Sequence, residues 1–261
     1  MKTVLLEEMT WPEIESAMKR GMDTVLIIAA SVEQHGPALP EITDTVRGYA
    51  EGIDLAKRLG NTLVAPVIRP GLSQHHMHFP GSITLRPEVF KGIVEDYVEA
   101  YILHGFRTII LTSSHGGNYG ALAEITEELA SKHPEICIVS GCGSGELDEI
   151  LIQMEQSEGL PVGTCGGHAC DWETSEMMML DEAYVRKDKL QQGYVGPITD
   201  EILDRFFHKG VDAVSEIGVW GDPTGANAER GKRYFEFYQD MQEKAIRRNL
   251  EAWREKNCSD F

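Results

Sequence analysis

Hydrophobic residues in the first half of the chain are concentrated in short, continuous runs. Four of these runs are predicted to be buried strands, at residues 24–30, 62–67, 107–112 and 136–140. Unbroken apolar runs of this kind are typical of a parallel sheet, whose strands are covered on both faces. Pro66 lies near the end of the second run and indicates an interruption or a sheet edge, because proline has no N–H for a neighbouring strand.

Segments with a helical spacing of apolar residues separate these strands. Thr10 and Glu13 have the spacing of a capping box and predict a helix that ends at Gly21. A second helix is predicted from Thr45 to Leu59, before Gly60, because glycine commonly follows a helix C-terminus. Further helices are predicted at residues 87–104, 119–132, 146–156, 198–208 and 229–256, and the methionines at 177–179 continue a helix whose core they are expected to fill.

The alternation of strands and helices predicts the fold class. It favours an α/β fold of three layers, α/β/α, in which helices cover both faces of a mostly parallel sheet. No internal repeat, low-complexity segment or clear linker divides the sequence, so residues 1–261 are expected to form a single domain. The highly charged C-terminal helix is expected to lie on the outside.

Composition narrows the classes of partner. The chain has 261 residues, of which 42% are hydrophobic, enough for an ordinary core. Its 42 acidic and 24 basic residues give a net charge of −18, which argues against nucleic acid or an anionic membrane as the main partner. No apolar window is long enough to span a bilayer, and the N-terminus turns acidic early, so a cytoplasmic protein is expected.

The cysteines leave one alternative open. There are five, an odd number, so a disulfide framework is not expected. Cys137 and Cys142, and then Cys165 and Cys170, form pairs with wider gaps than the usual zinc knuckle, although a zinc site built from all four is conceivable. Cys137 lies within an apolar run, where cysteine behaves as a small core residue.

Candidate chemistry is concentrated in the loop that follows the first predicted strand. Residues 31–44 contain Glu33, His35 and Asp44, with glycine and prolines between them. Open α/β sheets bind ligands at the carboxyl ends of their strands, and carboxylates mixed with imidazoles hold divalent metal ions. For such a short motif alone, a surface loop with scattered polar residues is the simpler interpretation.

Two further glycine-rich loops change that balance. His115 follows the strand at 107–112, and His168 and Glu173 lie in the segment 163–176. A lone histidine is usually a hydrogen-bonded core or surface residue, but three distant loops that each supply a histidine or carboxylate favour one shared site. Asp44 could be only the N-cap of the next helix, or its two oxygens could bridge two cations.

These motifs together resemble a known family. The stretches in question are Ser31 to Pro37 with Thr43-Asp44, His78 to Ser82, His115-Gly116-Gly117-Asn118, His168 with Glu173 to Ser175, and Gly218 to Pro223. In this order they resemble the creatininase (creatinine amidohydrolase) family. The resemblance implies a creatininase-like α/β/α fold, two divalent metal ions (zinc, manganese or iron), hydrolysis of non-peptide C–N bonds, and a homo-oligomer, often a hexamer.

The resemblance also implies roles for individual residues. Glu33 and His115 would bind one metal ion, His35 the other, and Asp44 would bridge them, while His168 would transfer the proton. In creatininases proper, the third motif resembles His-Tyr-Glu-Asn. This chain has Gly117 at the position of that glutamate, so Glu173 is expected to be the fifth ligand. The substrate-binding residues are expected to be His78, Gly116, Gly117 and Trp172. His75, His76 and His78 could line the mouth of the pocket, although for at least two of them a hydrogen-bonded loop histidine is the simpler interpretation.

The His-Gly-Gly-Asn motif favours a substrate other than creatinine. It resembles the formamide deformylases of the family and its sugar- and inositol-pathway hydrolases. The leading expectation is a metal-dependent hydrolase of a small cyclic amide or formamide. The alternatives are C–C bond cleavage in an oxidised sugar or keto-inositol by the same metal centre, and a metal-binding or sensory protein without catalysis.

Overall fold

The computed structural model describes residues 2–257, and its centre is a parallel four-stranded sheet. The strands are β1 (Thr24–Ala29), β2 (Thr62–Val64), β3 (Thr108–Ser113) and β4 (Cys137–Ser140), in the spatial order β2-β1-β3-β4. β1 and β3 occupy the middle and pair along their whole length, from Thr24 opposite Thr108 to Ala29 opposite Ser113. The four apolar runs therefore form the strands that the sequence predicts.

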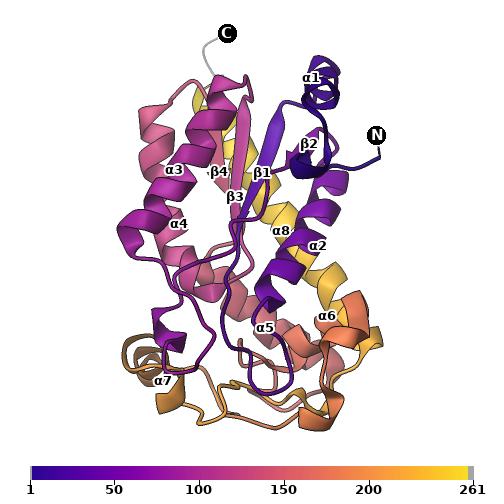
Figure 1. The fold of residues 1–261 in the computed structure, drawn as a ribbon, viewed down its shortest axis with the longest axis vertical. Coiled ribbons are helices and arrows are strands. Elements are labelled where there is room, and N and C mark those ends of the chain that lie inside the picture. The colour runs from indigo at the N-terminus through magenta and orange to yellow at the C-terminus, as the bar shows by residue number, and fades with distance from the viewer. Residues whose placement is uncertain (1, 258–261) are drawn as a thin grey trace.

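Helices cover both faces of this sheet (Figure 1). On one face, Val25 and Ile27 of β1 pack in a core with α3 (Pro87–Leu103) and α4 (Tyr119–Lys132). On the other face, the alternate residues Leu26 and Ile28 pack with α2 (Thr43–Leu59) and α8 (Ala228–Asn257). Successive side chains of a strand point to opposite faces, so one apolar run serves both cores. The predicted α/β fold is confirmed.

Four further α-helices complete the described part of the chain. They are α1 (Trp11–Lys19), α5 (Ser144–Glu158), α6 (Asp171–Asp181) and α7 (Asp200–Asp204). The segment predicted as one helix at 198–208 is α7 followed by a π-helix, Arg205–Lys209. Of the methionines at 177–179, Met177 and Met178 are buried, as expected for core filling. The single-domain organisation stays a prediction.

The C-terminal helix is less external than its charge suggests. One face of α8 is buried and carries Tyr234, Tyr238 and Gln242, and the helix packs closely on α6 and β4. Its charged residues occupy the opposite face. The expectation that α8 lies on the outside therefore holds for one face of the helix and is wrong for the other.

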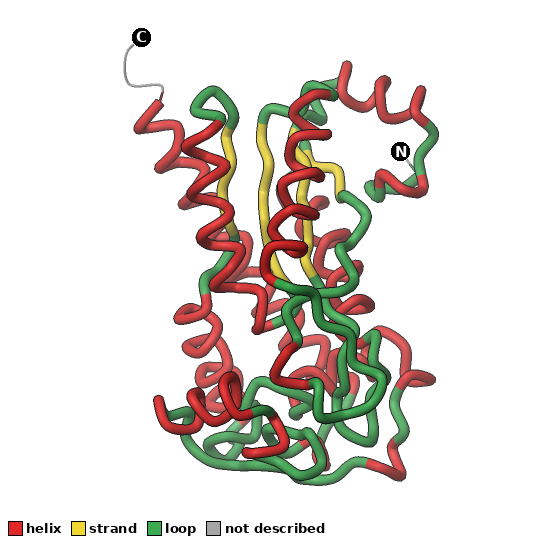
Figure 2. Tube along the Cα trace, turned by 60° about the vertical axis from the view of Figure 1, so that its left-hand side comes forward, coloured by secondary structure: helices red, strands yellow, loops and turns green. Residues whose placement is uncertain are grey.

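The sheet sends its loops toward one end of the molecule. In Figure 2 the strands occupy the upper part of the molecule, and most of the long loops gather below them. Because Ala29 and Ser113 are paired at the ends of β1 and β3, the loops that carry Glu33 and His115 leave the sheet side by side. None of the helices formed by residues 2–257 combines the length and the apolar character needed to cross a membrane.

Candidate metal centre

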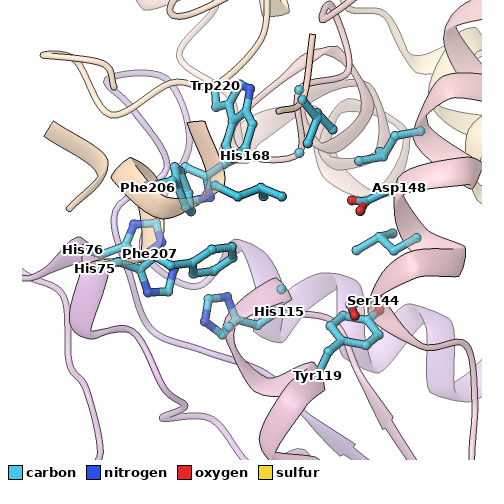
Figure 3. Close-up of a pocket in the computed structure, with 18 of the residues that line it drawn as sticks. His75, His76, His115, Tyr119, Ser144, Asp148, His168, Phe206, Phe207 and Trp220 are labelled. Carbon is cyan, nitrogen blue, oxygen red and sulfur yellow. The ribbon is translucent and has the colours of Figure 1, made fainter. Parts of the chain in front are cut away.

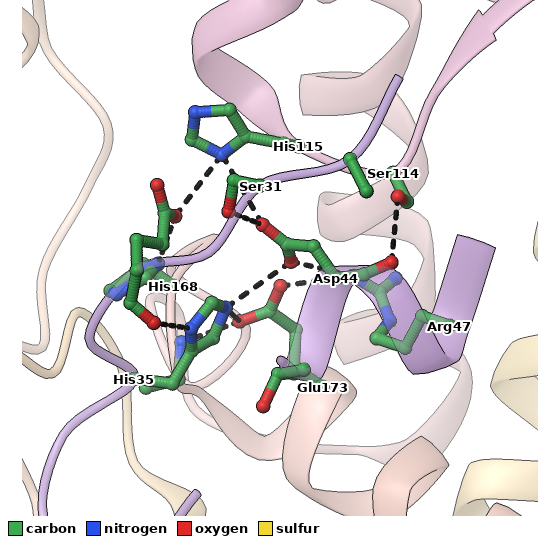
Figure 4. Close-up of polar contacts among 12 residues, drawn as sticks. Ser31, His35, Asp44, Arg47, Ser114, His115, His168 and Glu173 are labelled. Atoms are coloured by element: carbon green, nitrogen blue, oxygen red, sulfur yellow. Dashed lines mark hydrogen bonds and ion pairs between the residues drawn. The ribbon is translucent and has the colours of Figure 1, made fainter. Parts of the chain in front are cut away.

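Six polar side chains meet below the carboxyl ends of β1 and β3, and all six are buried (Figure 4). We call this set the carboxylate–histidine cluster; its members are Glu33, His35, Asp44, His115, His168 and Glu173. They come from the loop after β1, the first turn of α2, the loop after β3, the loop before α6, and the first turn of α6. The structure thus brings together every residue that the sequence assigns to metal binding or proton transfer.

The loop after β1 is shaped to turn Glu33 and His35 inward. Gly36 has a φ of +62°, and a Cβ at this position would lie 2.4 Å from the Val219 side chain, so only glycine fits. The Glu33 N–H donates to the Glu41 carbonyl oxygen at 3.0 Å and holds the two ends of the loop together. The close approach of Gly36 to Val219 explains why the first motif contains a glycine.

Asp44 belongs to the cluster and is not a helix cap. α2 begins at Thr43, with Ile42 at the N-cap, so Asp44 is already inside the first turn. The Ser31 hydroxyl donates to Asp44 Oδ2 at 2.5 Å, and the Ser114 hydroxyl donates to the Asp44 backbone carbonyl at 2.8 Å. The N-cap interpretation is therefore wrong, and the predicted helix start at Thr45 is late because the helix has no side-chain cap.

The two oxygens of Asp44 face two different histidines. Oδ1 lies 3.2 Å from His35 Nε2, and Oδ2 lies 3.4 Å from His115 Nδ1. Each histidine also faces a second carboxylate: Glu33 Oε1 is 3.1 Å from His115 Nδ1, and Glu173 Oε2 is 3.8 Å from His35 Nε2. The arrangement is two adjacent sets of carboxylate and imidazole atoms that share one aspartate.

Both imidazoles are oriented as metal ligands usually are. His35 Nδ1 donates to the Glu33 carbonyl oxygen at 3.0 Å, and His115 Nε2 donates to the Leu72 carbonyl oxygen at 3.1 Å. Such backbone bonds fix the ring and leave the inner nitrogen for a metal ion. The inner His35 Nε2 and both carboxylate oxygens of Glu33 are buried without a hydrogen-bond partner. Orphaned atoms of these types are what a divalent cation would satisfy, so the residues fit a metal site.

The carboxylates also change the acidity of the histidines. Burial by itself lowers the pKa of His35, but Asp44 and Glu173 outweigh it and raise that pKa to about 10. In the same way, Glu33 and Asp44 outweigh burial and raise the pKa of His115 well above its usual value. Burial lowers the pKa of His168 to about 3, so this ring is neutral near pH 7. Without a metal ion, these raised pKa values favour positively charged His35 and His115 rings beside the carboxylates.

A buried arginine holds Glu173 from behind. Arg47 donates to Glu173 Oε1 at 2.9 Å and to Glu176 Oε2 at 2.8 Å, and its guanidinium lies 4.1 Å from the centre of the Trp172 ring. The Ala169 N–H donates to the other oxygen, Glu173 Oε2, at 2.5 Å. Glu173 is thus fixed with Oε2 toward His35.

A pocket of about 290 Å³ opens onto the cluster (Figure 3). Glu33, His115 and His168 form part of its wall, together with Gly116 and Gly117. Most of the remaining wall is apolar and includes an aromatic group, Phe206, Phe207 and Trp220. The two glycines predicted to contact substrate therefore line the pocket that reaches the cluster.

The other two predicted substrate-binding residues lie elsewhere. His78 is largely exposed, pairs with Asp212 at 3.6 Å and lines a separate small pocket. Trp172 is buried under Arg47, where its indole N–H donates to Glu176 Oε1 at 2.6 Å, and it does not line the pocket on the cluster. Substrate contact by these two side chains stays a prediction, to which the geometry lends no support.

The sequence did not single out several residues of the pocket wall. Phe206, Phe207 and Asp148 lie in segments predicted only as helices, and nothing in their local pattern marks them. His75 and His76, considered for the pocket mouth, do line it. No metal-capable group among residues 2–257 includes a cysteine, and the fifth cysteine, Cys258, lies outside the described residues, so the zinc-knuckle alternative gains no support.

Comparisons with known proteins agree with this geometry. A family model described as "Creatininase: Creatinine amidohydrolase" matches residues 7–246. A mycofactocin precursor peptide peptidase from Mycobacterium ulcerans (strain Agy99) is 32% identical over 234 residues, covering 87% of this chain and 81% of that protein. A 3-dehydro-scyllo-inosose hydrolase from Thermotoga maritima is 25% identical over 268 residues, covering 96% and 85%.

Solved structures show the same fold. The structure named "Creatininase Mn" matches with a TM-score of 0.76 at 25% identity and covers 98% of this chain and 99% of that one. The family resemblance of the sequence motifs is confirmed by the match over nearly the whole chain. The chain therefore belongs to the creatininase family of hydrolases.

Proposed function

We propose that this protein is a dinuclear metal-dependent amidohydrolase that cleaves the C–N bond of a small molecule. Glu33 and His115 would bind one ion, His35 and Glu173 the other, and Asp44 would bridge them. The observation that carries the proposal is Asp44, whose two oxygens lie 3.2 and 3.4 Å from different histidines. A carboxylate shared in this way is what a two-metal hydrolase needs.

The bound ions, which we expect to be zinc, manganese or iron, would supply a water with a pKa near 7 and polarise the substrate carbonyl. The protein must then move a proton to the leaving nitrogen, and His168 is our candidate for this role. His168 Nε2 donates to the Gln34 carbonyl oxygen at 2.8 Å, which leaves Nδ1 without a proton and 3.8 Å from Glu33 Oε1. A neutral ring with an open nitrogen at the edge of the cluster can accept a proton and return it to the leaving group.

Pocket size supports a compact substrate, for which we propose a small cyclic amide or a formamide. A volume of about 290 Å³ lies at the lower end of the range for ligand sites, and the aromatic wall of Phe206, Phe207 and Trp220 suits an uncharged ring or chain. Gly116 leaves room for the substrate beside His115, because a Cβ there would meet nothing within 4 Å, and the backbone of Gly117 also lines the pocket.

Two relatives favour other substrates for the same metal centre. Similarity to the mycofactocin precursor peptide peptidase supports a peptide bond, which is also a C–N bond. Similarity to the 3-dehydro-scyllo-inosose hydrolase supports C–C bond cleavage in a keto-inositol. The peptide candidate keeps the chemistry that we propose and changes only the length of the substrate, whereas the keto-inositol candidate changes the bond that breaks.

A substrate screen with product analysis tests the proposal. Metal-loaded protein would be incubated with lactams, formamides, short peptides and keto-inositols, each compared with chelator-treated protein and with a His168→Ala variant. The expected result, which should stop on chelation, is a ring-opened product with a new amine and carboxylate from a lactam, or release of formate with an amine or ammonia from a formamide. Exclusive C–C cleavage, or turnover that chelation leaves intact, would refute the amidohydrolase assignment, and metal binding without any turnover would favour the sensory alternative.

Two physical measurements accompany the screen. Elemental analysis is expected to give two divalent ions per chain, and one ion or none would contradict the bridging role of Asp44. Light scattering is expected to show a homo-oligomer, for which a hexamer is the family expectation.

A further inference from the structure

Gln34, which separates Glu33 from His35, has an amide whose orientation is fixed by the backbone. The side chain is buried; Oε1 accepts the Gly36 N–H at 2.8 Å, and Nε2 donates to the Gly218 carbonyl oxygen at 3.2 Å. If the nitrogen and oxygen of the Gln34 amide exchanged places, two N–H donors would face each other at Gly36 and two oxygens would face each other at Gly218. The backbone is also shaped around this amide, because a Cβ at Gly218 would lie 2.1 Å from Gln34 Oε1.

The second proton of this amide determines the state of a neighbouring histidine. Gln34 Nε2 lies 2.9 Å from His76 Nδ1, and its other proton is already given to Gly218, so it donates its remaining proton to that ring nitrogen. His76 Nδ1 is therefore an acceptor, and the proton of the neutral imidazole must lie on Nε2. His168 Nε2 also lies 2.9 Å from Gln34 Nε2, but it donates its own proton to the backbone carbonyl oxygen of Gln34.

The protonated nitrogen of His76 faces the cluster. His76 Nε2 lies 3.3 Å from Glu33 Oε1, is buried, and has no hydrogen-bond partner among residues 2–257. The ring lines the pocket beside His168 (Figure 3). By distance alone, Glu33, His76 and His168 could hold a third ion. A ring nitrogen that carries a proton has no lone pair for a metal, so the tautomer excludes this use of His76.

We infer that Gln34 is a positioning residue that locks His76 as an Nε2–H donor, so that this edge of the pocket binds a negatively charged substrate oxygen instead of a third metal ion. The oxygen would be the one that gains charge when the acyl carbon is attacked. Fixed N–H donors are the usual means of stabilising such an oxygen, and loss of one commonly lowers kcat by about 10²–10³-fold. The donor role rests on the proposed function, whereas the tautomer does not.

Nitrogen NMR of the histidine side chains tests the tautomer directly. In ¹⁵N-labelled, zinc-loaded protein we expect the His76 proton on Nε2, and His76→Gln identifies the signal by its disappearance. In Gln34→Glu, the carboxylate accepts where the amide donated, so the His76 proton should move to Nδ1. His168 should keep its Nε2 proton in this variant, because its partner is the backbone of residue 34, and it serves as the internal control. An Nδ1 proton on His76 in the unaltered protein would overturn the inference.

Metal content and turnover test the donor role. His76→Leu is expected to keep the full metal content while kcat falls about a hundredfold, and His76→Gln, whose amide still carries N–H donors, should recover part of the loss. Loss of metal in His76→Leu would show that His76 is a ligand and refute the inference, as would an unchanged kcat. If no substrate is turned over at all, the proposed function fails, but the NMR result still decides the tautomer.

Discussion

Metal binding is expected to displace one proton from His35 and one from His115. Both rings are protonated in the metal-free protein at pH 7, because nearby carboxylates outweigh burial and raise the pKa of His35 to about 10 and the pKa of His115 well above its usual value. The same nitrogens that hold these protons, His35 Nε2 and His115 Nδ1, face the carboxylates. A cation can bind there only if the protons leave.

The size of the effect on metal affinity follows from the difference between the pKa of the histidine and the pH of the solution. For a group with a pKa of about 10, roughly one ring in a thousand is unprotonated at pH 7, and removing its proton costs about 4 kcal/mol of the binding free energy. Each displaced proton makes the apparent metal affinity rise about tenfold per pH unit below the pKa of its ring. His35 alone therefore gives about tenfold per unit between pH 7 and 9, and His115 steepens the rise as long as its ring is protonated. The sign is fixed: affinity rises with pH.

Calorimetry can count these protons. Manganese or zinc would be titrated into metal-free protein at pH 7 in buffers of different ionisation enthalpy, because the dependence of the measured heat on the buffer gives the number of protons released. His35→Asn removes one ligand together with its proton, so it should bind the ion held by Glu33 and His115 and release one proton fewer than the unaltered protein. Comparing the heats per bound ion separates the ring proton from any proton lost by metal-bound water. Equal release by both proteins, or an affinity that does not change between pH 7 and 9, would refute the reasoning.

Four further outcomes are expected. Glu33→Gln should lose metal and activity while circular dichroism shows a folded protein; full activity would contradict its role as a ligand. His168→Ala should keep its metal but lose about 10²–10⁴-fold in kcat, and simultaneous metal loss in elemental analysis would make it a ligand. Because the pKa of His35 in the folded protein, about 10, exceeds the unfolded value of 6.5, urea titrations of metal-free protein should show stability falling as pH rises from 6.5 through 10. Gly218→Ala should cost about 1–3 kcal/mol in thermal unfolding, because φ is +73° and the new Cβ would strike Gln34; an unchanged Tm would show that the loop yields.

The fold could be predicted where one periodicity dominates. The apolar runs of β1 and β3 and the apolar stripe of α4, predicted and observed at Tyr119–Lys132, each fit one kind of element. Between α6 and α8, 3₁₀ segments, the short helix α7 and a π-helix follow one another, and no apolar periodicity in the sequence predicts them. The π-helix at Arg205–Lys209 and the buried face of α8 could not be predicted locally, since both depend on their packing partners.

The candidate site was predictable to the extent that its residues carry chemistry on their own. Glu33, His35 and Asp44 stand together in one loop after a strand, so their meeting required only the parallel sheet. The sequence suggested His76 only for the pocket mouth and did not single out Gln34, because the roles that we propose for them depend on a single hydrogen-bond contact of 2.9 Å between loops 42 residues apart. The local sequence around either residue cannot predict this hydrogen bond, because the bond forms only when the two loops have folded against each other.

The family resemblance implies a glutamate at the position of Gly117, so the proposed site needs a different carboxylate. A Cβ at position 117 would lie 2.4 Å from the Leu72 carbonyl oxygen and 2.5 Å from His115 Nε2, so this backbone cannot present a side chain there. Glu173 comes from the first turn of α6, and Arg47 occupies its Oε1 at 2.9 Å while Oε2 faces His35. A hydrogen-bonded cationic partner of this kind offsets part of the cost of burying a carboxylate. Arg47 and the Ala169 N–H therefore hold Glu173 with Oε2 aimed at His35 before any ion binds, which supports Glu173 as the fifth ligand.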